Sequence, residues 1–188
     1  MGTSGEATRR HIVETAYELF YGRGYARVGV DAVAEAAGVT KRTLYYHFRS
    51  KDDLLAAAVE RHHELALERI AHWAERLDGD APAMVDALFA ELARWAARPD
   101  WRGAGFTRLV MELADLPGHP ARAIARRHKA AVEARLAAEL ARRGVAGEQA
   151  LARELMLLLE GCLLLVLVHG DRSYAETAAG AARRLLAG

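Results

Sequence analysis

The stretch Gly38-Val-Thr-Lys-Arg-Thr-Leu-Tyr-Tyr-His-Phe-Arg-Ser-Lys51 predicts a short helix whose two ends are both specified. Thr40 is a natural N-cap, because its hydroxyl can accept a hydrogen bond from an unpaired backbone N–H of the first turn. Leu44 and Phe48 lie one turn apart and can pack inward together. The other faces carry cations, hydroxyls and aromatic rings. This composition suits a helix that enters a DNA groove, although an ordinary solvated amphipathic helix has the same pattern.

The residues before this helix complete a helix-turn-helix. Residues 30–37 repeat apolar side chains at i, i+3, i+4 and i+7, which is one face of a helix. Gly38 then supplies the left-handed backbone that a tight turn needs. A further apolar stripe at residues 12–20, closed by Gly22 and Gly24, predicts a third helix in front. In such a module the last helix reads the DNA major groove.

Residues 9–55 closely resemble the N-terminal domain of TetR-family transcriptional regulators. The shared runs are Ile12-Val-Glu-Thr-Ala-Tyr-Glu-Leu-Phe20, Gly24-Tyr25, Val30-Asp31, Val33-Ala-Glu-Ala-Ala-Gly-Val39, Thr43-Leu-Tyr-Tyr-His-Phe48 and Lys51-Asp-Asp-Leu54. The remainder of the chain resembles the family only in its length and its helical pattern. The resemblance implies a sequence-specific regulator, most often a repressor, which acts as a homodimer on a roughly palindromic operator of double-stranded DNA.

Two groups of side chains on the recognition helix are expected to bind DNA. Lys41 and Arg42 lie in its first turn, which usually reaches base edges, and Arg can pair bidentately with guanine. By the resemblance, Tyr45 touches bases or a thymine methyl group. By the same resemblance, phosphates are held by Thr43, Tyr46, His47 and Lys51. The alternatives are that the tyrosines pack within the module and that His47 faces its interior.

One position departs from the family pattern. The family usually has Ser or Thr just before its second helix, where the hydroxyl caps that helix and can touch a phosphate. Val28 and Gly29 stand there in this chain. We therefore expect this phosphate contact to be missing.

Charge is divided unevenly along the 188 residues. The whole chain carries a net charge of +1, whereas residues 1–51 hold eight Lys or Arg against five Asp or Glu, which is +3. Positive charge is therefore concentrated in the module that would approach phosphates. Hydrophobic residues make up 52% and charged residues 27%, as in a globular protein.

The chain after Ser50 is expected to be entirely helical. Ser50 can cap a long helix that begins at Lys51, and no strand pattern or internal repeat appears. The expected helices cover residues 51–77, 82–98, 106–115, 120–143 and about 148–170, with a capping box at Ser173 and Glu176 opening the last. The prediction is an all-α protein of about nine helices. Residues 1–50 form the DNA-binding domain, and residues 51–188 form a larger domain for effector binding and dimerisation.

The apolar segment Leu155 to Val168 is the candidate for a membrane-spanning helix. It is shorter than the ~20 residues of a membrane span, and Glu160 interrupts it. A helix that is apolar around most of its circumference is instead buried on both sides, one facing the core and the other a second subunit. Cys162 is the single cysteine, which excludes an intramolecular disulfide and Cys-rich zinc sites. With no signal-peptide pattern, we expect a cytoplasmic protein without a membrane partner.

The larger domain offers candidate ligand-binding residues but no enzyme motif. The pattern Glu60-Arg-His-His63 has one Glu-x-x-His, whereas a di-iron bundle needs two, so we expect no metal, no cofactor and no catalytic activity. Apolar and polar side chains that could surround a small hydrophobic or amphipathic effector are Phe89, Phe106, Val110, Met111, Glu112, His128 and Cys162. The alternative is the same fold with a partner-binding or constitutive domain and no small-molecule site.

Overall fold

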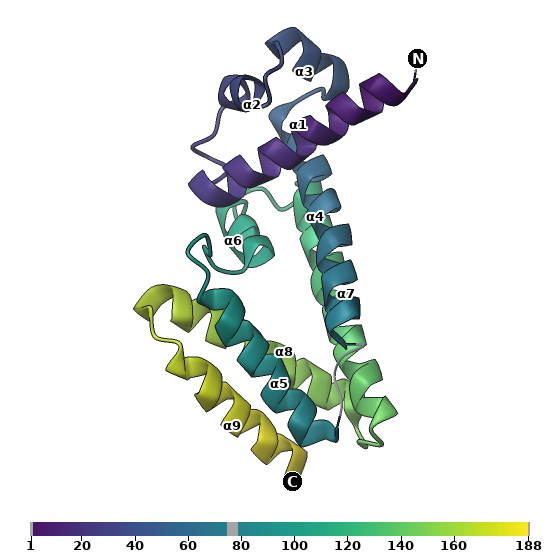
Figure 1. Ribbon diagram of the computed structural model, residues 1–188, viewed down its shortest axis with the longest axis vertical. Coiled ribbons are helices and arrows are strands. Elements are labelled where there is room, and N and C mark those ends of the chain that lie inside the picture. Colours follow the sequence, from purple (N-terminus) through teal and green to yellow (C-terminus); the bar gives the residue numbers. More distant parts are fainter. Residues whose placement is uncertain (1, 75–78, 188) are drawn as a thin grey trace. The chain divides into compact units, whose positions relative to one another are not determined.

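The computed structural model describes residues 2–74 and 79–187, and within these residues it contains nine helices and no strand (Figure 1). The helices are α1 (Gly2–Arg23), α2 (Val30–Ala36), α3 (Lys41–His47), α4 (Lys51–Ala74), α5 (Ala81–Ala96), α6 (Gly105–Glu112), α7 (Pro120–Arg142), α8 (Glu148–His169) and α9 (Ser173–Ala187). The all-α prediction is thus confirmed. The end expected near Leu77 lies outside the described residues.

Caps place most of the helix ends where local sequence predicts them. Thr40 Oγ1 accepts the backbone N–H of Thr43 at 3.0 Å, and Ser50 Oγ accepts that of Asp53 at 3.0 Å. Gly38 has a φ of +63°, which only a residue without Cβ adopts easily. The capping box expected at Ser173 is wrong, because this residue is already the first of α9 and donates both its N–H and its hydroxyl to Asp171. Gly29 is the N-cap residue of α2 and provides no side-chain cap, and the absence of a phosphate contact there stays a prediction.

The chain forms two compact units, each with its own apolar core. The first consists of residues 1–66 and 105–128, and the second consists of residues 67–104 and 129–188. Helices α4 and α7 therefore each contribute to both units. This division follows packing, whereas the boundary between residues 50 and 51 separates expected functions and stays a prediction.

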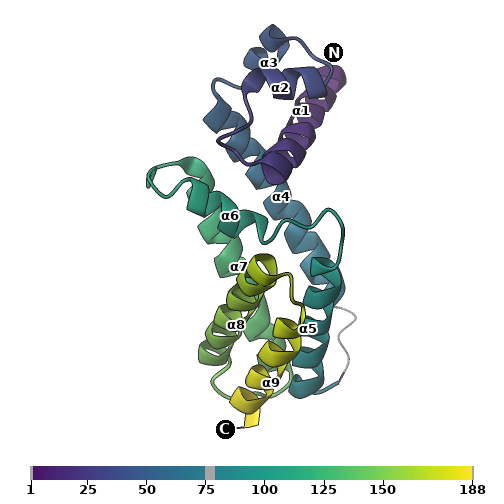
Figure 2. The same ribbon diagram turned by 90° about the vertical axis from the view of Figure 1, so that its left-hand side faces the viewer.

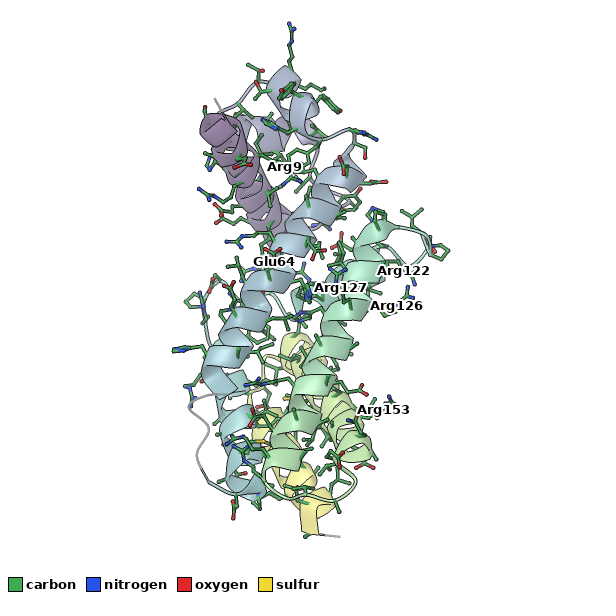
Figure 3. The ribbon with its side chains drawn as sticks, turned by 90° about the vertical axis from the view of Figure 1, so that its right-hand side faces the viewer. Arg9, Glu64, Arg122, Arg126, Arg127 and Arg153 are labelled. Atoms are coloured by element: carbon green, nitrogen blue, oxygen red, sulfur yellow. The ribbon has the colours of Figure 1, made fainter. Side chains whose placement is uncertain are left out.

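The first unit is built around the helix-turn-helix. Helices α1, α2 and α3 pack on one another (Figure 1), and Ile12, Val33, Leu44 and Phe48 are buried in their common core. This core continues into α4, α6 and the beginning of α7. Figure 3 shows Arg127 on α7, whose guanidinium binds the carboxylate of Glu60 on α4 with an Nη2–Oε1 distance of 2.6 Å.

The second unit is a helical bundle. Helices α5, α8 and α9 lie side by side (Figure 2), and their core includes the buried Met84, Phe89 and Leu155. Glu139 on α7 is a buried charge of this unit and binds Arg142 and Arg143 at 2.7 Å each. No described helix is long and apolar enough to cross a membrane.

Candidate nucleic-acid interface and pocket

The outward face of α3 is a surface of cations and aromatic rings over an apolar base. Leu44 is fully buried, which fixes the orientation of the helix, and Lys41 and Arg42 are exposed. Tyr46 is 85% exposed and Tyr45 is 46% exposed, so neither ring is packed into the module. This exposure argues against packing as the role of Tyr46, and the DNA contacts of both tyrosines stay predictions. The face can donate hydrogen bonds and stack at the same time.

Lys41 has a partner that sequence reasoning missed. Its Nζ lies 2.8 Å from Oδ1 of Asp31 on α2, and this hydrogen bond raises the pKa of Lys41. Both side chains are more than half exposed, so the ion pair is weak and can exchange for a DNA contact. The spacing of ten residues across a turn carries no helical periodicity, which explains why the pair could not be read from the sequence.

Thr43 and His47 lie closer to the body of the module. The Thr43 hydroxyl lies 2.8 Å from that of Thr40, and either oxygen can donate to the other. His47 is half-buried and packs edge-to-face on the ring of Tyr46, with centroids 5.1 Å apart. Both side chains are half-buried, and their phosphate contacts stay predictions.

Lys51 is held by the polypeptide itself. Its Nζ donates to the backbone carbonyl of Tyr25 at 2.6 Å and lies 4.0 Å from the centre of the Tyr25 ring. Burial lowers the pKa of Lys51, and burial together with a hydrogen bond to Asp52 raises the pKa of Tyr25. The structure thus gives Lys51 a role in joining α4 to the link after α1, and its phosphate contact stays a prediction.

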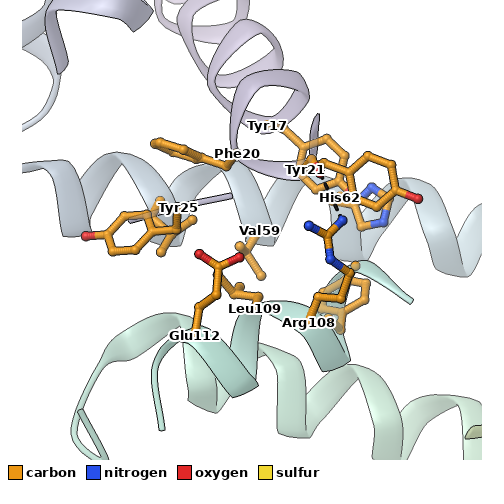
Figure 4. A pocket seen from close by; sticks show the side chains of 12 residues that line it. Tyr17, Phe20, Tyr21, Tyr25, Val59, His62, Arg108, Leu109 and Glu112 are labelled. Atoms are coloured by element: carbon orange, nitrogen blue, oxygen red, sulfur yellow. Dashed lines mark hydrogen bonds between the residues drawn. The ribbon is translucent and has the colours of Figure 1, made fainter. Parts of the chain in front are cut away.

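A pocket in the first unit gathers side chains from α1, α4 and α6 (Figure 4). It opens to solvent and has a cavity volume of only about 30 Å³. Tyr17 stacks on His62 at 4.0 Å between ring centres, and Arg108 Nη1 donates to the carbonyl of Tyr21 at 3.0 Å. The i, i+4 spacing of Tyr17 and Tyr21 was a readable signal that these rings share one face of a helix. Their meeting with α6 required the tertiary fold.

The candidate effector residues divide between the two units. Phe106 and Glu112 line the pocket, and Val110 packs beside the same core, whereas Met111 is 62% exposed. His128 stacks on Phe106 at 3.8 Å between ring centres and is itself buried. Phe89 and Cys162 lie in the core of the second unit, where burial raises the pKa of the Cys162 thiol. The structure therefore brings together only part of the predicted set.

Glu60 and His63, the two ends of the Glu-x-x-His pattern, have different partners. Glu60 binds Arg127, and Nδ1 of the buried His63 lies 3.2 Å from Nδ1 of His128. In the described part of the chain, no three His, Cys, Asp or Glu side chains come together as metal ligands would.

These features define a helix-turn-helix DNA-binding module followed by a larger helical region. Residues 12–58 match the model of the family described as bacterial regulatory proteins, tetR family. The chain is 42% identical over 59 residues to the HTH-type transcriptional regulator TtgR of Pseudomonas putida, a match that covers 31% of this chain and 28% of that protein. The chain thus matches less than a third of the length of this relative.

Solved structures extend the similarity over almost the whole chain. A TetR-family transcriptional regulator from Streptomyces coelicolor is 27% identical, with a TM-score of 0.82, and the match covers 95% of this chain and 94% of the other. Reduced NemR of E. coli is 22% identical, with a TM-score of 0.85 over 95% and 96% of the two chains, and shares the fold. Together these findings show a DNA-binding domain of the tetR family at residues 12–58 and, over almost the whole chain, the fold of a TetR-family regulator.

Proposed function

We propose that this protein is a sequence-specific transcriptional repressor that binds a palindromic operator as a homodimer and responds to a small molecule. The observation on which this rests is the exposed face of α3 above the buried Leu44 and Phe48. A rigid base holds the helix in one orientation, and the outward side chains are then free to meet DNA. Because the operator is chromosomal, the protein would act in the cytoplasm.

Base reading is assigned to the first turn of α3. Arg42 is exposed and has no hydrogen-bond or ion-pair partner among the described residues, so its guanidinium is available for the paired acceptors of guanine. Lys41 would exchange Asp31 for a base or a phosphate, and Tyr45 would contact a base edge or methyl group. Phosphate contacts are assigned to Thr43, Tyr46, His47 and Lys51.

The dimer is supported by apolar side chains left uncovered in the second unit. On α8, Leu157, Leu164 and Val168 recur at intervals of seven and four residues, which is one helical stripe, and Leu157 is 71% exposed. The exposed Leu185 extends apolar surface onto the neighbouring α9. Two such helix pairs would bury one another as a four-helix interface. A two-fold dimer would present two α3 helices to half-sites about one DNA turn apart, ~34 Å.

Repression and ligand response complete the proposal. Occupation of an operator that overlaps a promoter excludes RNA polymerase, so binding by itself represses. A small hydrophobic or amphipathic effector would release the operator only if it bound the DNA-free state more tightly. In this scheme residues 1–50 bind DNA, and residues 51–188 supply dimerisation and most of the effector contacts.

The direct test is fluorescence anisotropy with DNA from upstream of the protein's own gene, with scrambled DNA as competitor, at two salt concentrations. We expect binding roughly 10³-fold tighter than to scrambled DNA, because specific complexes exceed non-specific ones by at least this factor. The opposing outcome is that a genome-wide operator selection also yields only weak binding, with the same steep salt dependence on every sequence. The helix-turn-helix then binds DNA only through electrostatic attraction to phosphates, and the proposal fails. Specific binding that no compound alters would favour a constitutive or partner-binding domain.

A further inference from the structure

Five arginines of the helix-turn-helix region lie outside the predicted DNA contacts. All five are exposed, and none has an ion-pair partner for its side chain among the described residues. They are Arg9, Arg10, Arg23, Arg27 and Arg49. Exposed arginines are ordinarily no more than solvated surface residues. Arg9 and Arg49, however, adjoin Phe48, which is the C-cap residue of the recognition helix α3.

Arg9 occupies a core-facing position in the N-terminal half of α1 (Figure 3). Val13 and Ala16 follow it at i+4 and i+7, which is the same face of the helix, and both are buried. This register directs the Arg9 side chain toward the module, and its Cζ lies 5.1 Å from the centre of the Phe48 ring. The residue is nevertheless exposed, because a long stem can cover an apolar ring while its guanidinium reaches water.

The Phe48 ring gives this guanidinium a fixed support. Phe48 is 1% exposed and packs in the same core as Leu44, so it does not move independently of α3. A guanidinium that lies over an aromatic ring keeps its N–H donors for other partners, and no acceptor for them occurs among the described residues. Arg9 is thus held in place with its donors unused. A group that is already ordered loses less entropy when it binds a ligand.

The carboxyl end of α3 is also where a phosphate is expected. In helix-turn-helix proteins the N-terminal residues of the recognition helix contact base edges, and in homeodomains its carboxyl end contacts the DNA backbone. Arg49 directly follows this end, and Asp53 Oδ2 accepts its backbone N–H at 3.0 Å. The backbone of Arg49 is thereby fixed, while its side chain stays exposed. Two cations without ion-pair partners, one from α1 and one after α3, therefore adjoin the same end of the recognition helix.

We propose that Arg9 and Arg49 bind phosphates of the DNA backbone at the carboxyl end of α3, beyond the base pairs that Lys41 and Arg42 reach. Arginine suits this role because its planar fork of donors matches two phosphate oxygens at once. Phosphate contacts carry no base sequence, so this pair adds affinity for every duplex and fixes the position of α3 on it. The assignment rests on the proposed DNA binding and extends the DNA-binding surface from α3 to α1. The competing role is structural: Arg9 would only shield Phe48 and offset the partial negative charge at the end of α3.

Fluorescence anisotropy of the full-length protein with a random-sequence duplex, over a tenfold range of salt concentration, separates these two roles. Arg9→Gln keeps most of the stem over Phe48 and removes the charge, Arg49→Gln makes the same change at the second cation, and Arg9→Lys keeps the charge. Arg23→Gln is the matched control, because it removes an exposed charge at the other end of α1, about 21 Å from Arg9 along the helix axis. This distance exceeds the Debye length of ~10 Å at about 0.1 M salt. Melting by circular dichroism establishes that all four variants are folded.

The slope of log affinity against log salt concentration should become shallower by about 0.9 for each phosphate contact that is lost. We expect this change in Arg9→Gln and in Arg49→Gln. The affinity advantage of the wild type over either variant should therefore shrink at least about eightfold when the salt concentration rises tenfold. A dimer that has lost one contact per protomer should show about twice this change in slope. Arg9→Lys and Arg23→Gln should keep the wild-type slope.

A wild-type slope in Arg9→Gln or in Arg49→Gln overturns the assignment of that residue. An Arg9→Lys variant that binds as weakly and with as shallow a slope as Arg9→Gln also overturns it, because Arg9 then acts through its packing on Phe48. If the wild type binds no duplex at all, this proposal falls together with the proposed function. Because the probe is a random sequence, the result does not depend on whether the protein also recognises an operator.

Discussion

The buried glutamate of α7 provides a quantitative test of the second unit. The side chain of Glu139 is 9% exposed and binds Arg143, whose side chain is 5% exposed, at 2.7 Å. Glu139→Gln would remove the buried carboxylate that Arg143 binds. Glu133, on the same helix, binds Arg153 at 2.9 Å, and Arg153 is 75% exposed and projects from α8 (Figure 3). Glu133→Gln is therefore a control at a single exposed pair, whereas Glu139 also binds Arg135 and Arg142 of its own helix.

The expected loss in the free energy of unfolding depends on which hydrogen bonds Arg143 keeps in Glu139→Gln. Breaking a buried pair by removing one partner costs about 3–5 kcal/mol. The lower end applies here, because Arg143 Nη1 also donates to the backbone carbonyl of residue 139 at 2.9 Å and a glutamine oxygen can still accept. We expect Glu139→Gln to lower the free energy of unfolding by about 3 kcal/mol, and the melting temperature by about 6–12 °C for a chain of this length. The control should lose about 0–1 kcal/mol.

The pH dependence gives the same prediction a second observable. Burial raises the pKa of Glu139, but the hydrogen bonds from Arg143 and Arg142 outweigh it and leave the pKa below its ordinary value of 4.5. A carboxyl whose pKa is lowered by folding stabilises the native state above its unfolded pKa, and this contribution is lost as pH falls through the folded pKa. The stability difference between wild type and Glu139→Gln should therefore be full at neutral pH and shrink below about pH 4.5.

Urea unfolding followed by circular dichroism at 222 nm measures the three proteins. A single fixed protein concentration is needed throughout, because the proposed dimer formation would shift the apparent stability. Equal losses for Glu139→Gln and Glu133→Gln would refute the reasoning, since burial would then contribute nothing to the strength of the pair. A difference that is unchanged at pH 3 would refute the ionised state assigned to Glu139.

Four further substitutions test the DNA-binding surface and the dimer. Arg42→Ala should weaken operator binding by about 1–3 kcal/mol and scrambled DNA much less, and equal losses in anisotropy titrations would remove its base-reading role. Lys51→Met should lower the melting temperature, because Nζ binds the Tyr25 carbonyl, whereas a side chain that only holds phosphate would leave melting unchanged and weaken all DNA alike. Tyr46→Phe should weaken operator and scrambled DNA by the same factor, about 1 kcal/mol, with no change in melting, since the ring is largely exposed; a loss confined to the operator would contradict a phosphate contact. Leu164→Glu should convert a dimer to a monomer in light scattering, whereas Leu116→Glu, an equally exposed leucine of the first unit, should not; a dimer that survives Leu164→Glu would argue against the α8 interface.

The sequence by itself determined the helix-turn-helix and most helix boundaries. Thr40, Gly38 and Ser50 act on backbone groups within one turn of themselves, so their effect is visible in a short window. The burial of Leu44 and Phe48 follows from their spacing in the same way. Ser173 shows the limit of such reasoning. Asp171, two residues earlier, accepts both the N–H and the hydroxyl of Ser173, and a single motif does not rank competing acceptors.

Only the tertiary structure decided which distant side chains share a site. Phe106 and Glu112 join Tyr17 and Tyr21 in one pocket across some 90 residues of chain, whereas Phe89 packs in the other unit. Helical periodicity states which face of a helix is apolar but not which other helix covers it. The environment of a charge depends on that partner, because burial and counter-ions come from elements that are remote in sequence. For this reason the partner of Lys51, the hydrogen bond between Ala26 and Glu112 and the burial of Glu139 became visible only in the folded chain.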